Sequence, residues 1–497
     1  MLCIRKILQR GFRPGSRLLA VAGGVTLLSA CTVGPDYVRP TAVVPPVFKE
    51  MSGWKVAQPR DGAIRGAWWK IFNDGRLDEL EEQVSVSNQN VAAAEAQFRQ
   101  AHALAQGARA GYFPTVTAGG GVTRSNSPVR GGGGVAATST TVTEYLLSAS
   151  VSWELDLWGR VRRTVEAGQA SAQASAADLA AIRLSMQTTL AQDYFQLRTL
   201  DAQKRILDTT AANFRRFLEL TQNRYASGVA SRGDVLQAET QLKTTEAQAI
   251  DVGVQRAQLE HAIAVLIGKP AALFSLPAEP LAAVPPAITV GVPSALLERR
   301  PDIAGAERRI AAANAQIGVA KAAYFPTVTL SGSGGFSGPD LNDWLSWPNR
   351  FWSLGAALVE TLYDGGLRRA QTDQAWAAYD AEVAAYRQTV LTAFQEVEDN
   401  LAALRILEGE AKVQEEAVQA ARQAVQVTTN QYRAGTASAL DVIVNQTTEL
   451  TNERTAVTII GSRMNASVLL IKALGGGWNT SVLSSDDDST KKLDSLR

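Results

Sequence analysis

The hexapeptide Tyr-Phe-Pro-Thr-Val-Thr occurs twice in this sequence, at Tyr112–Thr117 and at Tyr324–Thr329. A second parallel follows in the same order, because the Tyr-x-x-Gly segment that ends at Gly228 is echoed by a similar segment that ends at Gly435. A unit of roughly 200 residues is therefore present twice, and a duplication of this kind restricts the fold to two similar halves.

The N-terminus has the form of a secretory signal. Five basic residues accompany an apolar run from Leu18 to Leu28, which is too short to remain in a bilayer as a spanning helix. Leu28-Ser29-Ala30-Cys31 resembles a bacterial lipobox, so we expect Cys31 to be the first mature residue and to carry a diacylglycerol and an N-acyl chain. The alternative is an ordinary signal followed by a chance cysteine. No later segment has 18 uninterrupted apolar residues, so we expect no transmembrane helix.

Charge and motifs argue against several functional classes. The net charge of the 497 residues is +1, whereas a nucleic-acid surface requires a basic excess. The two histidines, His102 and His261, have no cysteine or acidic ligands at metal spacing, so we expect neither a metal site nor any other cofactor. No phosphate-binding loop or acid–base pair is evident, and the sequence predicts a protein that is not an enzyme.

Local composition, above all the frequency of proline and glycine, divides the chain into segments. Proline and glycine are frequent after the lipobox and predict an extended arm, and the glycine- and aspartate-rich C-terminus predicts disorder. The predicted segments are a signal peptide (1–30), the arm (31–67), a first repeat (68–270), a linker (271–296), a second repeat (297–475) and a disordered tail (476–497).

Each repeat contains a predicted pair of strands. The first pair is 112–124 with 143–155, and the second is 324–336 with 351–362. Apolar and polar residues alternate along these strands, as they do from Leu147 to Leu155, which predicts one apolar and one polar face. We expect the glycine-containing segment between the first two strands to be a flexible loop.

Each repeat also contains a very long predicted helix that ends near its Tyr-x-x-Gly segment. Apolar residues recur at one heptad position, which predicts coiled-coil packing over a length on the order of 100 Å. The first repeat keeps the same seven-residue step except at Asp193. Shorter partner helices follow at about 232–266 and 438–474. The heptad positions of the second helix are Val383, Val390, Val397, Leu404, Ala411, Val418, Val425 and Tyr432.

Four strands with one apolar face cannot cross a membrane as an open sheet, because the edge strands would leave backbone groups unpaired in lipid. The strands must then close with copies from other subunits, giving eight strands from two subunits or twelve from three. A water-filled channel needs more than the eight strands of the smallest barrels. The alternative is a soluble antiparallel sheet that packs on helices.

Several segments are distinctive enough to indicate a family. They are Cys31–Tyr37 (CTVGPDY), Trp68-Trp69 with Phe72 and Leu77, and Leu297–Ile303 (LERRPDI), which continues through Ala306–Arg309 and Ala312–Gly318. With these segments the chain resembles the TolC-like outer membrane factors, in the lipoprotein branch of multidrug efflux channels. The resemblance covers nearly all of residues 28–475.

The resemblance implies a mixed α and β membrane protein that forms a homotrimer. Its twelve-stranded β-barrel, with four strands from each subunit, would lie in the outer membrane lipid, and a long α-helical barrel would continue it into the periplasm. The partners implied are a periplasmic adaptor (membrane-fusion) protein and an inner-membrane pump of the resistance-nodulation-division type. The function implied is a passive exit duct for drugs or other small molecules. A type I secretion-like channel of the same architecture and a periplasmic scaffold are the alternatives.

The resemblance also assigns roles to the helical tips, which form the periplasmic mouth in this family. Asp234 and Asp441 match acidic positions of the constriction, Leu440 matches an apolar gate position and Tyr432 matches a gate tyrosine. Ala437 departs from relatives that have an arginine at that position. The alternative for both aspartates is that they only support the first-turn helix dipoles.

The remaining tip residues are expected to form the turns and to contact the adaptor. Gly228 and Gly435 fit the residue after a helix, and Ser231 and Ser438 fit the cap before the next one. Tyr225 lies in the first of these turns.

Overall fold

The structure is a computed structural model that describes residues 32–51, 66–129, 138–279 and 296–478, together with 281, 285, 286 and 288. The predicted signal peptide, Cys31 and residues 479–497 lie outside the described residues. The start of the predicted disordered tail is ordered, because the Gly476 amide donates to the Ile471 carbonyl at 3.0 Å and Trp478 packs against Ala177 and Ala304.

Contacts within the chain define two compact units, and each unit draws on both sequence repeats. The two repeats therefore do not fold as two separate compact bodies. Unit 1 comprises 1–40, 100–172 and 308–384, and unit 2 comprises 41–99, 173–307 and 385–497.

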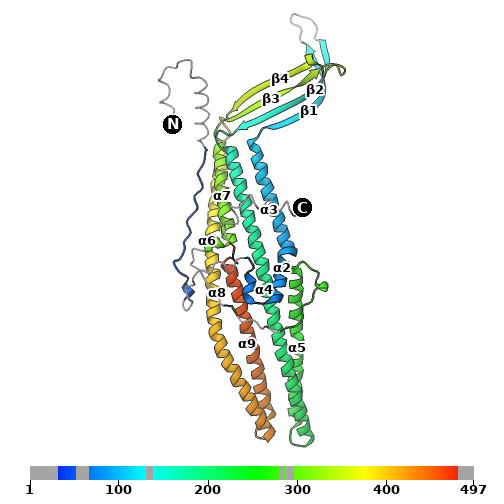
Figure 1. The fold of residues 1–497 in the computed structure, drawn as a ribbon, viewed down its shortest axis with the longest axis vertical. Helices are drawn as coiled ribbons and strands as arrows, with labels where there is room; N and C mark the ends of the chain where they lie inside the picture. Colours follow the sequence, from blue (N-terminus) through cyan, green and yellow to red (C-terminus); the bar gives the residue numbers. More distant parts are fainter. Residues whose placement is uncertain are drawn as a thin grey trace. The chain divides into compact units, whose positions relative to one another are not determined.

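Helices and strands follow one another in the order that the repeats predict (Figure 1). The elements are η1 (Lys49–Met51), η2 (Trp68–Phe72), α2 (Gly75–Ser87), α3 (Gln89–Arg109), η3 (Ala110–Tyr112), β1 (Thr115–Val129), β2 (Thr138–Leu155), α4 (Arg160–Ala226), α5 (Arg232–Leu266), η4 (Ala271–Leu273), α6 (Leu296–Arg299), α7 (Pro301–Ala322), β3 (Thr327–Gly338), η6 (Trp347–Asn349), β4 (Arg350–Val359), α8 (Leu367–Ala434) and α9 (Ala439–Ala473).

Unit 1 contains one antiparallel sheet with the strand order β1-β2-β3-β4. The first hairpin is longer than the sequence predicts, because pairing continues to Val129 and Thr138. Much of the expected flexible loop is therefore strand. The residues involved are mostly serine and threonine, and ladder hydrogen bonds between backbones do not require apolar side chains. The strands of the second hairpin run from 327 to 338 and from 350 to 359, within a few residues of the prediction.

The register of the sheet gathers the apolar side chains on one face. Val116 lies opposite Val151, and Trp153 lies opposite Leu330 on the next strand. The same face continues to β4, where Leu354 is 79 % exposed. Serine, threonine and glycine occupy most of the other face. A sheet with one exposed apolar face and one polar face is what a lipid-facing, channel-lining barrel wall requires.

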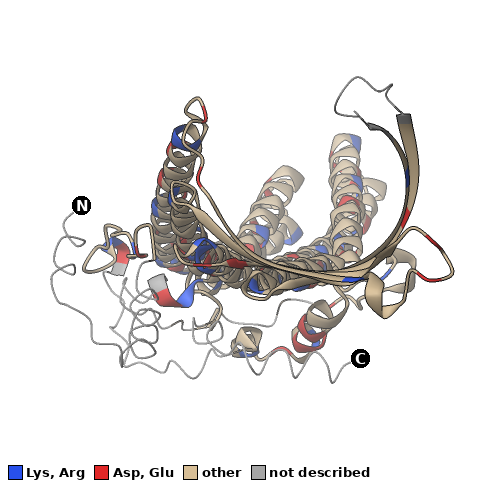
Figure 2. Ribbon diagram, turned by 90° about the horizontal axis from the view of Figure 1, so that it is seen from above, with Lys and Arg blue, Asp and Glu red and all other residues tan. Residues whose placement is uncertain are grey.

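Charged residues are rare in this sheet, which is tan over most of its length in Figure 2. Within the described strands the charged side chains are Arg124, Glu144, Glu154 and Arg350. Three of them have partners at or near the strand ends: Glu144 accepts from the Ser337 hydroxyl, Glu154 pairs with an arginine at the start of α4, and Arg350 lies 4.0 Å from the centre of the Trp347 ring. Among the residues that the structure describes, no strand pairs with the outer edge of β1 or of β4, so closure requires further copies.

Aspartate side chains start the long helix after each hairpin. Asp156 accepts from the Val161 amide at 2.8 Å and also binds Arg162. Asp364 accepts from the Gly366 amide at 3.0 Å and binds Arg368 in the same way. Each carboxylate satisfies helix N-terminal amides that have no intrahelical partner, which allows a strand to pass directly into a helix.

The long helices α4 and α8 have 67 and 68 residues and confirm the predicted coiled-coil helices. Most of their heptad residues in unit 2 are buried, including Leu207 on α4 and Val397 on α8. In unit 2, α4 continues into α5 and α8 into α9, which forms two helical hairpins (Figure 1). Helix α9 is apolar enough to meet a membrane-span criterion, with a mean hydropathy of 1.2, but half of that window is buried against the rest of the protein.

Candidate functional site: the helical tips and the N-terminal arm

The two tip turns have the same backbone. After α4, the Val229 amide donates to the Arg224 carbonyl at 2.9 Å, and after α8 the Thr436 amide donates to the Gln431 carbonyl at 2.9 Å. These bonds satisfy carbonyl groups that have no partner at a helix end. They require the residue just before the donor to have a left-handed backbone conformation. Gly228 and Gly435 occupy that position, with φ of 73° and 79°. Both glycines therefore have the turn role that the sequence predicts.

The next helix of each tip begins with a capping box. Ser231 accepts from the Asp234 amide at 3.1 Å, and the Asp234 carboxylate accepts from the Ser231 amide at 2.9 Å. Ser438 and Asp441 repeat this reciprocal pair on α9. Both aspartates thus support their helix ends directly, as one of the two interpretations of the sequence predicted. In both pairs the carboxylate accepts through its Oδ2 atom.

Leu440 and Asp441 are exposed in the first turn of α9, whereas their neighbours Ala439 and Val442 are buried. The Ser438 hydroxyl, and then its backbone amide, hydrogen-bond to Asp441 and lower the pKa of this carboxyl below its usual value. The carboxylate therefore stays charged at neutral pH. Leu440 is 49 % exposed, although it lies next to the buried cluster residue Ala439.

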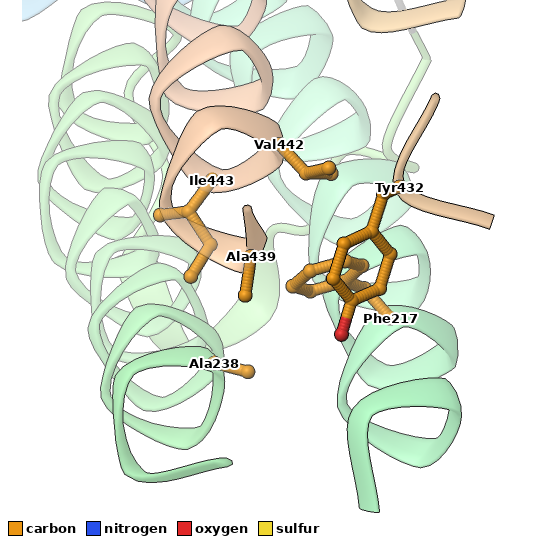
Figure 3. Packing of buried hydrophobic residues seen from close by; sticks show 6 residues of the cluster. All are labelled: Phe217, Ala238, Tyr432, Ala439, Val442 and Ile443. Carbon is orange, nitrogen blue, oxygen red and sulfur yellow. The ribbon is translucent and has the colours of Figure 1, made fainter. Parts of the chain in front are cut away.

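Tyr432 lies inside the tip, where only 3 % of it is exposed (Figure 3). Its ring centre is 5.2 Å from that of Phe217 on α4, and its hydroxyl is 3.4 Å from the Thr221 hydroxyl. The surrounding cluster takes residues from all four helices, namely Phe217, Ala238, Tyr432, Ala439, Val442 and Ile443. Ala437 packs against this cluster.

Arg224, near the end of α4, is the main partner of Tyr432, and its role was not predicted from the sequence. Its Nη1 donates to the Tyr432 carbonyl at 2.7 Å, and its guanidinium lies 4.6 Å from the centre of the tyrosine ring. The tyrosine thus has an arginine partner although residue 437 is alanine. The available signal was a basic residue in the last turn of α4, where the second tip has Gln431.

A second candidate site is the point where the N-terminal arm binds unit 1. The Val33 amide donates to the Trp158 carbonyl at 3.1 Å, directly after β2. Gly34 passes so close to α7 that a Cβ atom there would lie 2.6 Å from the Cα of Gly318. Larger side chains are excluded at this crossing, so the arm has a defined path from its first described residues.

An ion pair continues this contact. The Asp36 carboxylate lies 2.9 Å from Arg163, whose side chain is only 5 % exposed and also binds Glu166 at 2.8 Å. The Asn314 amide donates to the Pro35 carbonyl at 3.0 Å. These contacts bring together two of the segments that carry the family resemblance, Cys31–Tyr37 and Ala312–Gly318, although the sequence alone gave no indication that they meet.

In the described part of the chain, titratable groups outside these two sites form no recognisable catalytic or metal site. Within the described ranges, no group of three or more His, Cys, Asp or Glu residues could hold a metal ion. Glu81 is fully buried on α2, where desolvation, followed by the nearby charge of Asp78, raises the pKa of its carboxyl well above the usual value. A single buried carboxyl of this kind is a structural cost rather than a site.

Comparison with known proteins supports the same interpretation. The model of the outer membrane efflux protein family matches residues 80–269 and 292–476. The pyoverdine export outer membrane protein OpmQ of Pseudomonas aeruginosa is 31 % identical over 467 residues, which are 93 % of this chain and 97 % of that protein. The probable efflux pump outer membrane protein TtgC of Pseudomonas putida is 30 % identical over 472 residues, or 93 % of this chain and 96 % of that protein.

Solved structures show the same fold. The outer-membrane channel OprN superimposes with a TM-score of 0.83 at 32 % identity, covering 90 % of this chain and all of that one. The open state of the MtrE channel of Neisseria gonorrhoeae gives a TM-score of 0.77 at 26 % identity, covering 90 % and 98 %. These neighbours are trimers in which a β-barrel is continued by a long α-helical barrel, and the four-stranded sheet and helical hairpins described above correspond to one subunit. The chain therefore belongs to the outer membrane efflux protein family, as one subunit of a trimeric outer-membrane channel that serves as an exit duct.

Proposed function

We propose that this channel is the outer-membrane part of a tripartite efflux system, with a periplasmic adaptor and a proton-driven resistance-nodulation-division pump in the inner membrane. The relatives named for pyoverdine export and for an efflux pump both span nearly the whole chain, which supports small molecules as cargo. Deletion of the gene is expected to raise drug susceptibility without reducing protein secretion. The opposite pattern would favour the type I secretion-like alternative.

The periplasmic mouth is proposed to be closed at rest by Leu440 and Asp441. The observation that supports this best is the exposure of Leu440 beside a fully packed tip core. Three leucines around a narrow threefold axis would exclude water, and three carboxylates would repel anions and bind cations. Asp234, in the equivalent position of the first tip, would add to the same negative field. Tyr432 would act from inside the tip, by supporting the helix that leads to the turn.

Single-channel conductance in planar bilayers tests this gate. The double variant Leu440→Ala with Asp441→Ala is expected to conduct far more at rest than the wild-type trimer. The matched control is Leu236→Ala, which removes an equally exposed leucine (52 %) from α5. A double variant that conducts no more than this control would contradict the gate.

The N-terminal anchor is proposed to be Cys31 carrying a diacylglycerol and an N-acyl chain. The next residue, Thr32, packs against Gly159, so lipid on Cys31 would enter the membrane beside the point where β2 ends. Cys31→Ser is expected to remove the lipid and to leave the trimer folded. Mass spectrometry of the mature wild-type protein would contradict the proposal if it found no acyl mass on Cys31.

The turns at the tips are proposed to contact the adaptor. Tyr225 is 48 % exposed, and Gly228, Ser231, Gly435 and Ser438 are all exposed at the two ends. A photo-crosslinking residue at position 225 should capture the adaptor in cells. The same residue at position 206, where Ile206 is partly buried on α4, should capture no adaptor.

A further inference from the structure

The charged side chains of the sheet are divided between its two faces according to sign. Glu144 and Glu154 on β2 lie on the face that carries most of the serine and threonine residues. Arg124 on β1 and Arg350 on β4 lie on the apolar face, where Arg350 is paired with Phe336 of β3. Within the described strands, the face that contacts lipid therefore has two charged side chains, and both are basic.

Arg350 lies at the outer end of the sheet. It begins β4, where the chain returns from β3, whereas the helices of unit 1 adjoin the opposite end of these strands (Figure 1). Because the helices of this outer-membrane channel extend into the periplasm, Arg350 lies toward the cell exterior. From Leu358 to Arg350 the strand advances about 26 Å, or roughly 20 Å across the membrane at the usual tilt. The arginine therefore lies near the outer boundary of an apolar band that is typically about 25 Å tall.

The outward side chains of β4 form an apolar row that leads to Arg350. Leu354 and Trp352 are 79 % and 75 % exposed, and they share the face of the arginine because alternate residues of a strand point the same way. Their partners on β3 are Gly332 and Gly334, so no side chain of that strand covers them. An aromatic residue between an apolar row and a charged group is typical of the interface between lipid tails and headgroups.

The guanidinium of Arg350 lies over the ring of Trp347, 4.0 Å from the ring centre. A short turn holds this tryptophan in place, because the Asn349 side-chain amide donates to the Asp343 carbonyl at 2.9 Å and to the Ser346 hydroxyl at 3.3 Å. The ring covers one face of the planar guanidinium and leaves the N–H groups along its edge for an anion. Among the residues that the structure describes, no carboxylate forms an ion pair with Arg350.

We propose that Arg350, stacked on Trp347, binds a phosphate in the headgroup of lipopolysaccharide, the lipid of the outer leaflet of a bacterial outer membrane. The guanidinium would bind the phosphate through two parallel hydrogen bonds, the geometry that arginine forms with phosphate oxygens. The acyl chains of the same lipid would lie along the row of Leu354 and Trp352. This inference uses only the position of the sheet in the outer membrane and is independent of the proposed gate, adaptor and pump.

Native mass spectrometry of purified trimers tests the site, with lipid A, the acylated and phosphorylated part of lipopolysaccharide, as the probe. Arg350→Gln is expected to weaken the binding of lipid A about tenfold or more, because a charge-assisted pair of hydrogen bonds is lost. Trp347→Ala should weaken it less, because the charge remains while its orientation is lost. The matched control is Arg124→Gln, which removes the other arginine of the lipid face. It should have a clearly smaller effect, because no stacking ring is described for Arg124.

The chemical source of the phosphate is tested with two further lipids. Lipid A without phosphate groups should bind the wild type and Arg350→Gln equally weakly. If phosphatidylglycerol bound as tightly as lipid A and were weakened as much by Arg350→Gln, the site would bind phospholipid headgroups and the assignment to lipopolysaccharide would be wrong.

Two results with the arginine variants would overturn the site itself. One is binding of lipid A to Arg350→Gln at the wild-type level, and the other is an equal loss in Arg350→Gln and Arg124→Gln. The mass of the trimer in the same spectra shows whether each variant has assembled. If Arg350→Gln does not assemble, Arg350→Lys replaces it and should still bind lipid A more weakly than the wild type, because an ammonium group lacks the planar fork of arginine. Undiminished binding to Arg350→Lys in that case would overturn the proposal.

Discussion

The two helical tips have the same backbone but different interiors. Each has a left-handed glycine after the long helix and a serine–aspartate capping box before the short one. In the first tip, however, Tyr225 is 48 % exposed, while its counterpart Tyr432 in the second tip is 3 % exposed. Where α9 has the exposed Leu440, α5 has Gly233. Duplication has therefore kept the residues that make the turn and changed the residues that fill or close it.

This difference shows how one motif can serve two purposes. The first tip contributes Arg224 and Phe217 to the packing of the second, and the second has the side chains that can close a pore. Turn residues are restricted by backbone geometry, which the two copies share. Side chains beyond the turn are restricted by whatever they contact, and those contacts differ between the copies.

The largest expected effect is on the buried tyrosine. Tyr432→Ala should cost about 3–5 kcal/mol of local stability, as truncation of a buried aromatic does. Tyr225→Ala should change the local stability by no more than about 0.5 kcal/mol, as substitution of an exposed residue does. Hydrogen exchange of the tip amides, measured by mass spectrometry, would show these differences. Equal losses of protection in the two variants would mean that the tips are more alike than the burial of their tyrosines indicates.

The helices that lead to the tips differ at one heptad position. Burial raises the pKa of Asp193 to about 6, so its neutral form is favoured in the folded state. The contribution of Asp193 to the free energy of unfolding is therefore fully present below the ordinary aspartate pKa of about 3.9. It is lost as the pH rises towards 6. Asp193→Leu completes the heptad of α4 and should raise stability at neutral pH, by less than the roughly 1.5–3 kcal/mol of a fully buried leucine, because the position is only partly buried.

Thermal unfolding followed by circular dichroism tests the Asp193 prediction. The unfolding temperature of the wild type should decrease as the pH is raised from 4 to 6, apart from effects common to both proteins. The unfolding temperature of Asp193→Leu should exceed that of the wild type most at pH 7. The conservative control Asp193→Asn should remove the pH dependence without adding the apolar contact. A leucine variant that is less stable than wild type at pH 7 would refute the idea that α4 and α8 share one packing pattern.

The turn glycines should respond equally in the two tips. Gly228→Ala and Gly435→Ala each place a Cβ atom at positive φ, which costs about 1–2 kcal/mol. Neither new atom meets a neighbour closely, since no atom lies within 4 Å at Gly228 and only Arg224 Nη2 lies at 4.0 Å at Gly435. Hydrogen exchange of the two turns should therefore increase by similar factors. A much larger effect at Gly435 would show that the Arg224 contact also restricts the second turn.

The smallest effect concerns the charge at the α9 capping box. Because the pKa of Asp441 is lowered in the folded protein, its stabilising contribution is present above the ordinary aspartate pKa and is lost as pH falls through the lowered value. Protection of the first turn of α9 should therefore decrease on acidification in the wild type. Asp441→Asn should show a weaker decrease, and Asp234→Asn provides the matched change on α5. An identical acid response in the wild type and Asp441→Asn would contradict this account.

Much of the fold is predictable from local patterns. Alternation along the strands, the seven-residue step of α8 and the serine–aspartate spacing of the tips each indicate an element that the structure contains. These patterns succeed because they depend on neighbours a few residues away. The end of the first hairpin was mispredicted, because Ser125–Val129 and Thr138–Thr141 lack apolar alternation and pair through their backbones alone.

The contacts that distinguish the two tips could not be predicted in this way. Arg224 and Tyr432 are 208 residues apart in the sequence, and the local sequence of neither turn indicates that they are in contact. The same holds for Asp36 and Arg163, which join the arm to the start of α4. A basic residue near a helix end indicates a favourable dipole interaction, but it does not identify its partner.

Local sequence thus accounts for two equal turns, two long helices and a sheet with one apolar face, because helix period, strand alternation and left-handed glycine are properties of short segments. Only the tertiary structure decides that Tyr432 is enclosed while Tyr225 faces outward. Burial depends on which side chains arrive from other helices, and here Phe217, Thr221 and Arg224 all arrive at the second tip. Two copies of one motif therefore become different once each has its own surroundings.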